Sequence, residues 1–123
     1  MRPDRRHRPT CLHWALASTF SDVGWRPAAD LYRTNDGWLV KFDLAGVDPH
    51  EVTVRTEGRR LTVTGERHDC CLGEGCHYQS LEIAYSRFER HVDIPVDLEA
   101  AHLTTVYEAG MLLVRIQTEE VRP

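Results

Sequence analysis

The sequence predicts an all-β fold, a compact antiparallel β-sandwich of about seven or eight short strands. Two observations predict it: apolar and polar residues alternate in short runs, and turn-forming residues separate those runs. The chain has 123 residues, of which 41% are hydrophobic and 28% charged, as expected for one soluble globular domain. We expect an N-terminal arm over residues 1–24, a sandwich domain over 25–117 and a short C-terminal extension over 118–123.

Five runs show an alternation of period two, which sends successive side chains to opposite faces of a strand. In the run 38–44, Trp38 and Phe42 share one parity while Lys41 has the other. The other runs cover residues 52–55, 61–64, 88–94 and 112–116. Each run therefore predicts a half-buried strand.

Short turn-forming segments separate these runs. Asn35-Asp36-Gly37, Glu57-Gly58-Arg59 and Ala109-Gly110 stand where antiparallel hairpins or short loops would turn. Ala109 leaves the type of the last turn open, because a positive φ is costly for alanine. Pro49 and Pro95 should close strands or open loops, since proline cannot donate to a sheet ladder.

The N-terminal arm combines a basic start with an apolar stripe. Leu12, Leu16 and Phe20 recur every four residues, a spacing that places them on one face of a short helix. Such a stripe either packs against the sandwich of its own chain or of a second subunit, or it stays free to contact other proteins. His13 and Trp14 interrupt the apolar run too early for an export signal, so we expect a cytoplasmic protein.

Little in the sequence supports catalysis or the binding of charged polymers. It contains no phosphate-binding glycine loop and no Gly-x-Ser-x-Gly turn. The net charge is −4, and beyond the first ten residues the basic side chains cluster only around residues 55–60. We expect no enzymatic activity, no cofactor, no nucleic-acid partner and no membrane segment.

Three cysteines fall in one loop, at Cys70, Cys71 and Cys76, with His68 and His77 at its borders. Thiolates and imidazoles this close in sequence can hold zinc or copper, but the second pair of ligands usual for a structural zinc site is missing. The thiols could instead form a redox-dependent or intersubunit disulfide, or simply lie in a solvated loop. We favour the solvated loop and expect no bound metal.

Arg90 has an unusual place in the pattern, because it shares strand parity with Phe88 and Val92. A guanidinium on an apolar face needs a partner, since an unpaired buried charge costs several kcal/mol. Arginine is suited to bidentate pairing with a carboxylate across an interface. Alternatively, the strand twists or lies at an edge, and Arg90 extends to solvent.

At these residues the sequence resembles the small heat-shock protein (α-crystallin) family, from about residue 25 to residue 116. No single segment is specific, but their order and spacing match those of the family. The matching segments are Trp25-Arg26-Pro27, Ala29-Asp30-Leu31-Tyr32, Asp43-Leu44-Ala45-Gly46-Val47, Leu61-Thr62-Val63-Thr64-Gly65-Glu66-Arg67, Phe88 with Arg90 and Ile94-Pro95, and Tyr107 with Gly110-Met111-Leu112.

The resemblance implies an immunoglobulin-like sandwich that acts as an ATP-independent holdase. Such a chaperone binds unfolding proteins, prevents their aggregation and leaves refolding to ATP-driven chaperones. The loop after residue 67 would carry a strand exchanged with a second subunit, so the resemblance implies a homodimer interface that includes Tyr78, Leu81, Ile83 and Arg90.

The end of the chain departs from the family pattern. Residues 117–123 contain no Ile-x-Ile or Ile-x-Val tail, the segment that usually fills an apolar groove of a neighbouring dimer. We therefore expect dimers or small assemblies whose groove is open to clients. The residues expected to bind clients are Val52, Val54, Leu103 and Thr105 in the groove and Leu12, Trp14, Leu16 and Phe20 in the arm.

Two other functions are compatible with the same sandwich. A p23-like co-chaperone would act as an adaptor on one ATP-driven partner. A thiol- or metal-responsive sensor would use the cysteine loop.

Overall fold

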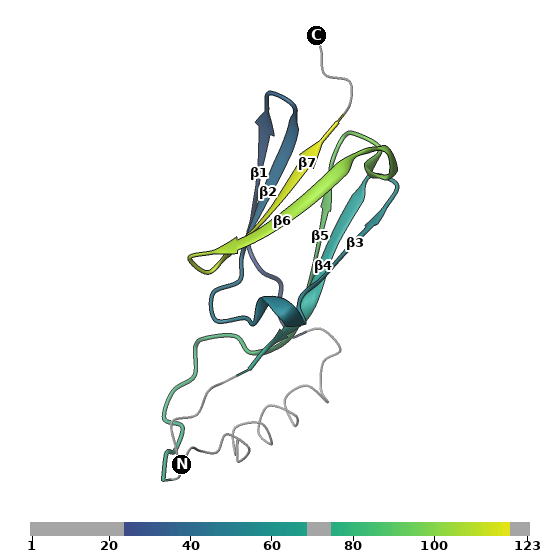
Figure 1. The fold of residues 1–123 in the computed structure, drawn as a ribbon. Helices are drawn as coiled ribbons and strands as arrows, with labels where there is room; N and C mark the ends of the chain where they lie inside the picture. The colour runs from purple at the N-terminus through teal and green to yellow at the C-terminus, as the bar shows by residue number, and fades with distance from the viewer. Residues whose placement is uncertain (1–23, 69–74, 119–123) are drawn as a thin grey trace.

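The structure, a computed structural model, describes residues 24–68 and 75–118. They form two antiparallel sheets that face each other (Figure 1). The larger sheet has the order β1-β2-β7-β6, with β1 (Ala29–Thr34), β2 (Gly37–Asp43), β7 (Met111–Gln117) and β6 (His102–Glu108). The smaller has the order β3-β4-β5, with β3 (Thr53–Glu57), β4 (Arg60–Arg67) and β5 (Ser86–Asp93). This arrangement confirms the predicted sandwich.

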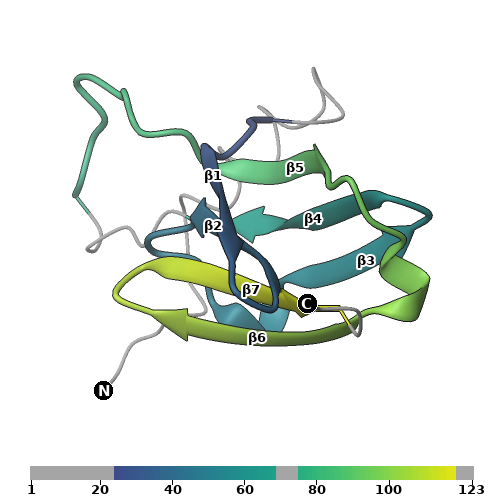
Figure 2. The same ribbon diagram turned by 90° about the horizontal axis from the view of Figure 1, so that it is seen from above.

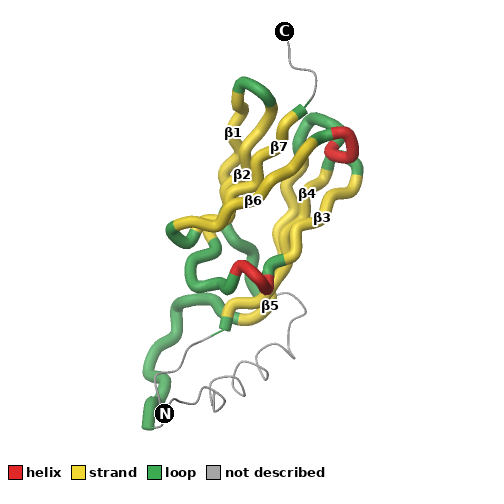
Figure 3. Tube along the Cα trace, in the orientation of Figure 1, coloured by secondary structure: helices red, strands yellow, loops and turns green. Residues whose placement is uncertain are grey.

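Helical structure in the described residues is restricted to two single turns. Figure 3 shows them at opposite ends of the sandwich, η2 (Pro49–Glu51) and η3 (Leu98–Ala100). Each is capped by an aspartate: the side chain of Asp48 accepts a hydrogen bond from the His50 amide, and that of Asp97 accepts one from the Glu99 amide. Over the described residues, no helix is long and apolar enough to cross a membrane.

The core lies between the sheets and consists of the alternating apolar residues. Phe42 pairs with Leu112 and Val40 with Val114 across β2 and β7, and all four side chains are buried. Leu61, Val63 and Phe88 close the core from the smaller sheet. Each such side chain contributes about 1.5–3 kcal/mol when it is fully buried. The alternation predicted these inward faces correctly.

Two-residue turns connect β1 to β2, β3 to β4 and β6 to β7. In the last of these, Ala109 has φ 54° and Gly110 has φ 78°, the two positive angles of a type I′ turn. The turn whose type the sequence left open is therefore type I′. It destabilises the chain at Ala109, because the left-handed region is unfavourable by about 1–2 kcal/mol for a residue with a Cβ.

Asp36 joins the first turn to the end of the last strand. Its carboxylate accepts hydrogen bonds from the side chains of Gln117 (2.9 Å) and Thr34 (3.2 Å), and its carbonyl accepts one from the Thr118 amide. The hydrogen bond from Gln117 is the main cause that lowers the pKa of Asp36 below its ordinary value of 3.8. This contact fixes the position where the chain leaves the larger sheet.

Residues 75–85 project from the sandwich as a loop that forms no strand within this chain (Figure 2). Tyr78, Leu81 and Ile83 expose 37%, 51% and 62% of their surface. An exposed group of large apolar side chains on a projecting segment is typical of an interaction surface.

Candidate functional site

The candidate site is built on the edges of the two sheets. The strand orders leave β6 at one edge of the larger sheet and β3 at one edge of the smaller sheet. Figure 2 shows β3 as the strand of the smaller sheet nearest to β6. An edge strand carries backbone N–H and C=O groups without a partner strand, so an extended peptide can pair with it.

Half-buried apolar side chains lie on or beside these edges. Val52, Val54 and Leu103 pack against the core but are not covered by it. Tyr107 lies on the same face of β6 as Leu103, and its hydroxyl donates to the carbonyl of Leu44 at 2.9 Å. Thr105, between these two β6 residues, is exposed.

The structure places Val54 on β3, Val52 just before it, and Leu103 and Thr105 on β6, and a groove formed by these residues stays a prediction. Sequence reasoning missed Tyr107, although its two-residue spacing from Thr105 and four-residue spacing from Leu103 gave a usable parity signal. The arm residues Leu12, Trp14, Leu16 and Phe20 lie outside the described residues, so their proximity to the groove stays a prediction.

The other edge of the smaller sheet is closed by the segment before β1. The amides of Gly24 and Trp25 both donate to the carbonyl of Arg87, and the Glu89 amide donates to the carbonyl of Trp25. The Trp25 ring contacts the buried Phe88 ring, with centroids 5.2 Å apart. Strand β5 is therefore sealed along this stretch.

Arg90 completes this seal. Its side chain is half-buried, on the face predicted from its parity with Phe88. Nη1 donates to the carbonyl of Pro27 at 3.0 Å and Nε to the carbonyl of His91 at 3.2 Å. Within residues 24–68 and 75–118, no carboxylate lies within ion-pair distance of Arg90. The guanidinium of Arg90 therefore finds its partners within the chain, and they are carbonyl oxygens and not a carboxylate. A role of Arg90 at an interface stays a prediction.

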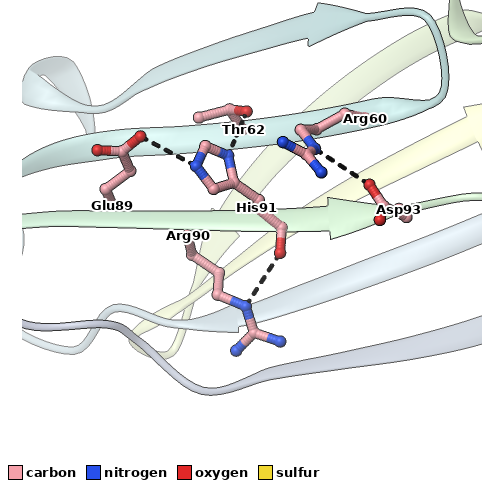
Figure 4. A network of polar contacts seen from close by, with 6 residues as sticks. All are labelled: Arg60, Thr62, Glu89, Arg90, His91 and Asp93. Carbon is pink, nitrogen blue, oxygen red and sulfur yellow. Dashed lines mark hydrogen bonds and ion pairs between the residues drawn. The ribbon is translucent and has the colours of Figure 1, made fainter.

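The outward face of β4 and β5 carries polar contacts. Figure 4 shows the His91 ring between Thr62 and Glu89, with Nδ1 2.9 Å from Thr62 Oγ1 and Nε2 3.1 Å from Glu89 Oε2. Arg60 and Asp93 form an ion pair at 3.1 Å beside them. Surface pairs of this kind contribute about 0–1 kcal/mol each. We assign them no function.

The cysteine loop is only partly described. Cys76 is exposed, whereas Cys70 and Cys71 lie outside the described residues. Among the described residues, no three histidine, cysteine, aspartate or glutamate side chains are grouped as metal ligands. A redox role for the three cysteines stays a prediction.

Comparison with known proteins gives a consistent result. Residues 30–123 match the Hsp20/alpha crystallin family. The chain is 33% identical over 98 residues to the 18 kDa heat shock protein of Streptomyces albus G, covering 77% of this chain and 68% of that protein. It is 31% identical over 133 residues to an alpha-crystallin of Mycobacterium tuberculosis, covering 98% of this chain and 89% of that protein.

A solved structure agrees with the sandwich. The crystal structure of hspA from Xanthomonas axonopodis superposes with a TM-score of 0.65 at 26% identity, covering 76% of this chain and 94% of that chain. The curated relatives differ in length, and the chain spans 24%, 68% and 61% of three of them. A family match over three quarters of the sequence, on a sandwich of the same architecture, shows that this chain belongs to the Hsp20/alpha crystallin family of small heat-shock proteins.

Proposed function

We propose that this protein is an ATP-independent holdase, a chaperone that binds unfolding proteins and prevents their aggregation. The observation that carries the proposal is that half-buried apolar side chains lie at two free strand edges, β3 and β6, which would form a groove together. Val52, Val54 and Leu103 offer apolar surface beside two strand edges in a chain of the small heat-shock family. Unfolding proteins expose the two features that such a groove accepts, apolar side chains and unpaired backbone.

The groove suits weak and sequence-tolerant binding. Each apolar contact contributes about 1.5–3 kcal/mol only when it is fully buried, so one half-covered contact holds a client poorly. Several chains in one assembly hold a client together through effective concentration. The proposal therefore includes self-association, and it assigns client contacts to the arm residues Leu12, Trp14, Leu16 and Phe20 as well.

We assign the homodimer interface to the projecting loop. Tyr78, Leu81 and Ile83 are exposed there, while Leu31 and Tyr32 are exposed on β1, the free edge of the larger sheet. A loop with apolar residues from one copy can add a strand to the free edge of the other. This exchange would cover both apolar groups at once.

Other parts of the proposal rest on the family resemblance alone. These are a contribution of Arg90 to the interface, the transfer of clients to ATP-driven refolding chaperones, and a location in the cytoplasm. We propose no enzymatic activity and no bound cofactor.

The direct test is light scattering from a heated client protein, with no ATP and no other chaperone present. The intact chain should suppress scattering. Val54→Asp places a carboxylate in the groove and should remove most of this activity. Thr53→Asp is the matched control, because the same carboxylate one residue earlier projects from the opposite, exposed face of β3.

A loss of activity in Val54→Asp is meaningful only if the chain still folds. Val54→Thr, which has nearly the same shape, should lose part of the activity with a similar unfolding midpoint. If the intact chain leaves aggregation unchanged, the holdase proposal is wrong and an adaptor function is favoured. If Thr53→Asp loses as much activity as Val54→Asp, the groove is not the binding site.

A further inference from the structure

The base of the projecting loop is held by one side chain, that of Arg67 at the end of β4. Its Nε and Nη2 both donate to the carbonyl of Ala84, at 3.0 and 2.6 Å. Its Nη1 donates to the carbonyl of Ala45 at 3.0 Å. Every nitrogen of the guanidinium therefore bonds to backbone, and the bonds connect the loop base to the segment after β2.

Two aromatic rings flank the same guanidinium. The Cζ atom of Arg67 lies 4.1 Å from the centroid of the Trp25 ring and 5.6 Å from that of Tyr85. Cation–π contacts at these distances fix the plane of the group as well as its position. Trp25 also donates from Nε1 to the carbonyl of Ser86 at 3.2 Å. Residues 84, 85 and 86 each thus contact Arg67 or Trp25.

The backbone at this position cannot relax easily. Ser86 is 4% exposed and has φ 92°, in the region that residues with a Cβ rarely adopt. A Cβ on Gly24 would overlap the Ser86 hydroxyl and lie close to the Arg87 carbonyl, so a larger residue there would force a shift of the neighbouring atoms. Strain of this kind persists only where the surroundings determine the conformation, and it concentrates at functional sites.

The consequence concerns the direction of the loop. Between residue 75 and residue 85 the chain forms no strand, so nothing regular within the loop sets its course. The contacts at residues 84–86 set the angle at which it leaves β5. In the proposed dimer, this angle would decide where the exposed side chains of Leu81 and Ile83 meet the second copy.

We propose that Arg67 is a positioning residue for dimerisation, which holds the loop base in the geometry needed for exchange between two copies. The inference rests on the proposed loop-exchanged dimer and names the group that prepares it. Prior ordering of a binding segment lowers the entropy cost of association. Loss of Arg67 should therefore weaken the dimer more than it weakens the folded chain.

The test compares Arg67→Ala with Arg60→Ala in the full chain. Arg60 lies at the other end of β4, and its one side-chain contact with the described part of the chain is the exposed ion pair with Asp93, so its removal controls for the loss of a β4 arginine. Analytical ultracentrifugation gives the dimer dissociation constant, and urea unfolding below that concentration gives the stability of the single chain. We expect Arg67→Ala to raise the dissociation constant at least about tenfold, and Arg60→Ala to change it less than about threefold.

The conservative variant Arg67→Lys sharpens the result. A lysine keeps the charge but cannot bond Ala84 and Ala45 through a planar fork, so the dissociation constant should fall between those of the intact chain and Arg67→Ala. A dissociation constant within about threefold of the intact chain in both Arg67 variants would overturn the inference. So would a fall in single-chain stability that accounts for the whole change, since that indicates a purely structural role.

Limited digestion with chymotrypsin measures how well the base of the loop is ordered, independently of dimerisation. Tyr78 is exposed in every case, whereas Tyr85 is half-buried beside Arg67. In chains kept monomeric by dilution, Arg67→Ala should speed cleavage after Tyr85 about tenfold and leave cleavage after Tyr78 unchanged. Equal rates after Tyr85 in both chains would overturn the inference. If the intact chain never dimerises, the loop-exchange proposal fails, and Arg67 then has no dimer to position.

Discussion

The edge strand β5 and the edge strands β3 and β6 are covered to very different degrees. Strand β5 is sealed: residues 24 and 25 bond to its backbone, Trp25 packs on Phe88, and Arg90 bonds to Pro27. By contrast, β3 and β6 end their sheets, with Val54 half-buried on one and Leu103 half-buried on the other. One chain thus carries a closed edge at β5 and open edges at β3 and β6 around the same core.

This difference suggests that one edge contributes mainly to the stability of the folded chain and the other mainly to the proposed chaperone activity. The sealed side uses an aromatic pair and backbone hydrogen bonds, which contribute to folding of the single chain. The open side leaves unpaired edges and apolar surface, which a stable monomer avoids unless a partner uses them. Substitutions on the sealed side should therefore cost stability, and substitutions in the groove should cost chaperone activity.

The largest expected effect is that of Trp25→Ala on the sealed side. The substitution removes the contact with Phe88 and the hydrogen bond to Ser86, and it leaves a cavity, so unfolding should become easier by about 3 kcal/mol. Val54→Ala in the groove deletes half-buried methyl groups and should cost only about 1 kcal/mol. Urea unfolding at one protein concentration measures both. Equal losses would mean that the two sides do not differ in stability.

The next effect is that of Arg90→Ala, which leaves the Pro27 carbonyl without its donor. A hydrogen bond from a charged group contributes about 1.5–3 kcal/mol, and the half-buried site places the loss near 2 kcal/mol. Arg87→Ala is the control, since this neighbouring side chain on β5 is exposed. If the two variants unfold at the same urea concentration, the contact with Pro27 contributes nothing to the seal.

A substitution in the turn between β6 and β7 should raise the stability of the chain. Ala109 has φ 54° in a type I′ turn, a conformation that asparagine adopts more readily. Ala109→Asn should stabilise the chain by about 1 kcal/mol, and Ala109→Gly by less, because glycine gains entropy in the unfolded state. The groove residues are unchanged, so activity per folded chain should stay constant. A lower thermal midpoint in Ala109→Asn would contradict this account of the turn.

Much of the fold could be predicted because alternation of period two and turn residues are local signals. The inward faces of β2, β4 and β7 followed from them, as did the half-buried side of Arg90. Sequence reasoning also expected Val52, Val54 and Leu103 to line one groove, and this expectation depends on a strand order that came from the family resemblance.

The remaining features depend on contacts between segments far apart in sequence. Nothing near Arg67 shows that its guanidinium will meet Ala84, Ala45 and Trp25 together, because β4 brings them close only after folding. The carbonyl partner of Arg90 was also missed, since Pro27 is 63 residues away and backbone acceptors leave no mark in the sequence.

The smallest expected effect lies at Asp36, remote from both sides of the comparison. Its pKa is lowered in the folded chain, chiefly by the hydrogen bond from Gln117, so the ionised form stabilises the fold. This contribution is fully present above the ordinary pKa of 3.8 and is lost as the pH falls through the lower folded value. Asp36→Asn should therefore be slightly less stable than the intact chain at neutral pH and equally stable in strong acid.

Gln117→Leu tests the cause of this pH dependence. The substitution removes the main donor to the Asp36 carboxylate, so Asp36→Asn should cost less stability in the Gln117→Leu background than in the intact chain. Thermal unfolding of the intact chain, the two single variants and the double variant, from neutral pH into strong acid, measures both effects. A difference between the intact chain and Asp36→Asn that does not change with pH would show that the carboxylate charge contributes nothing there.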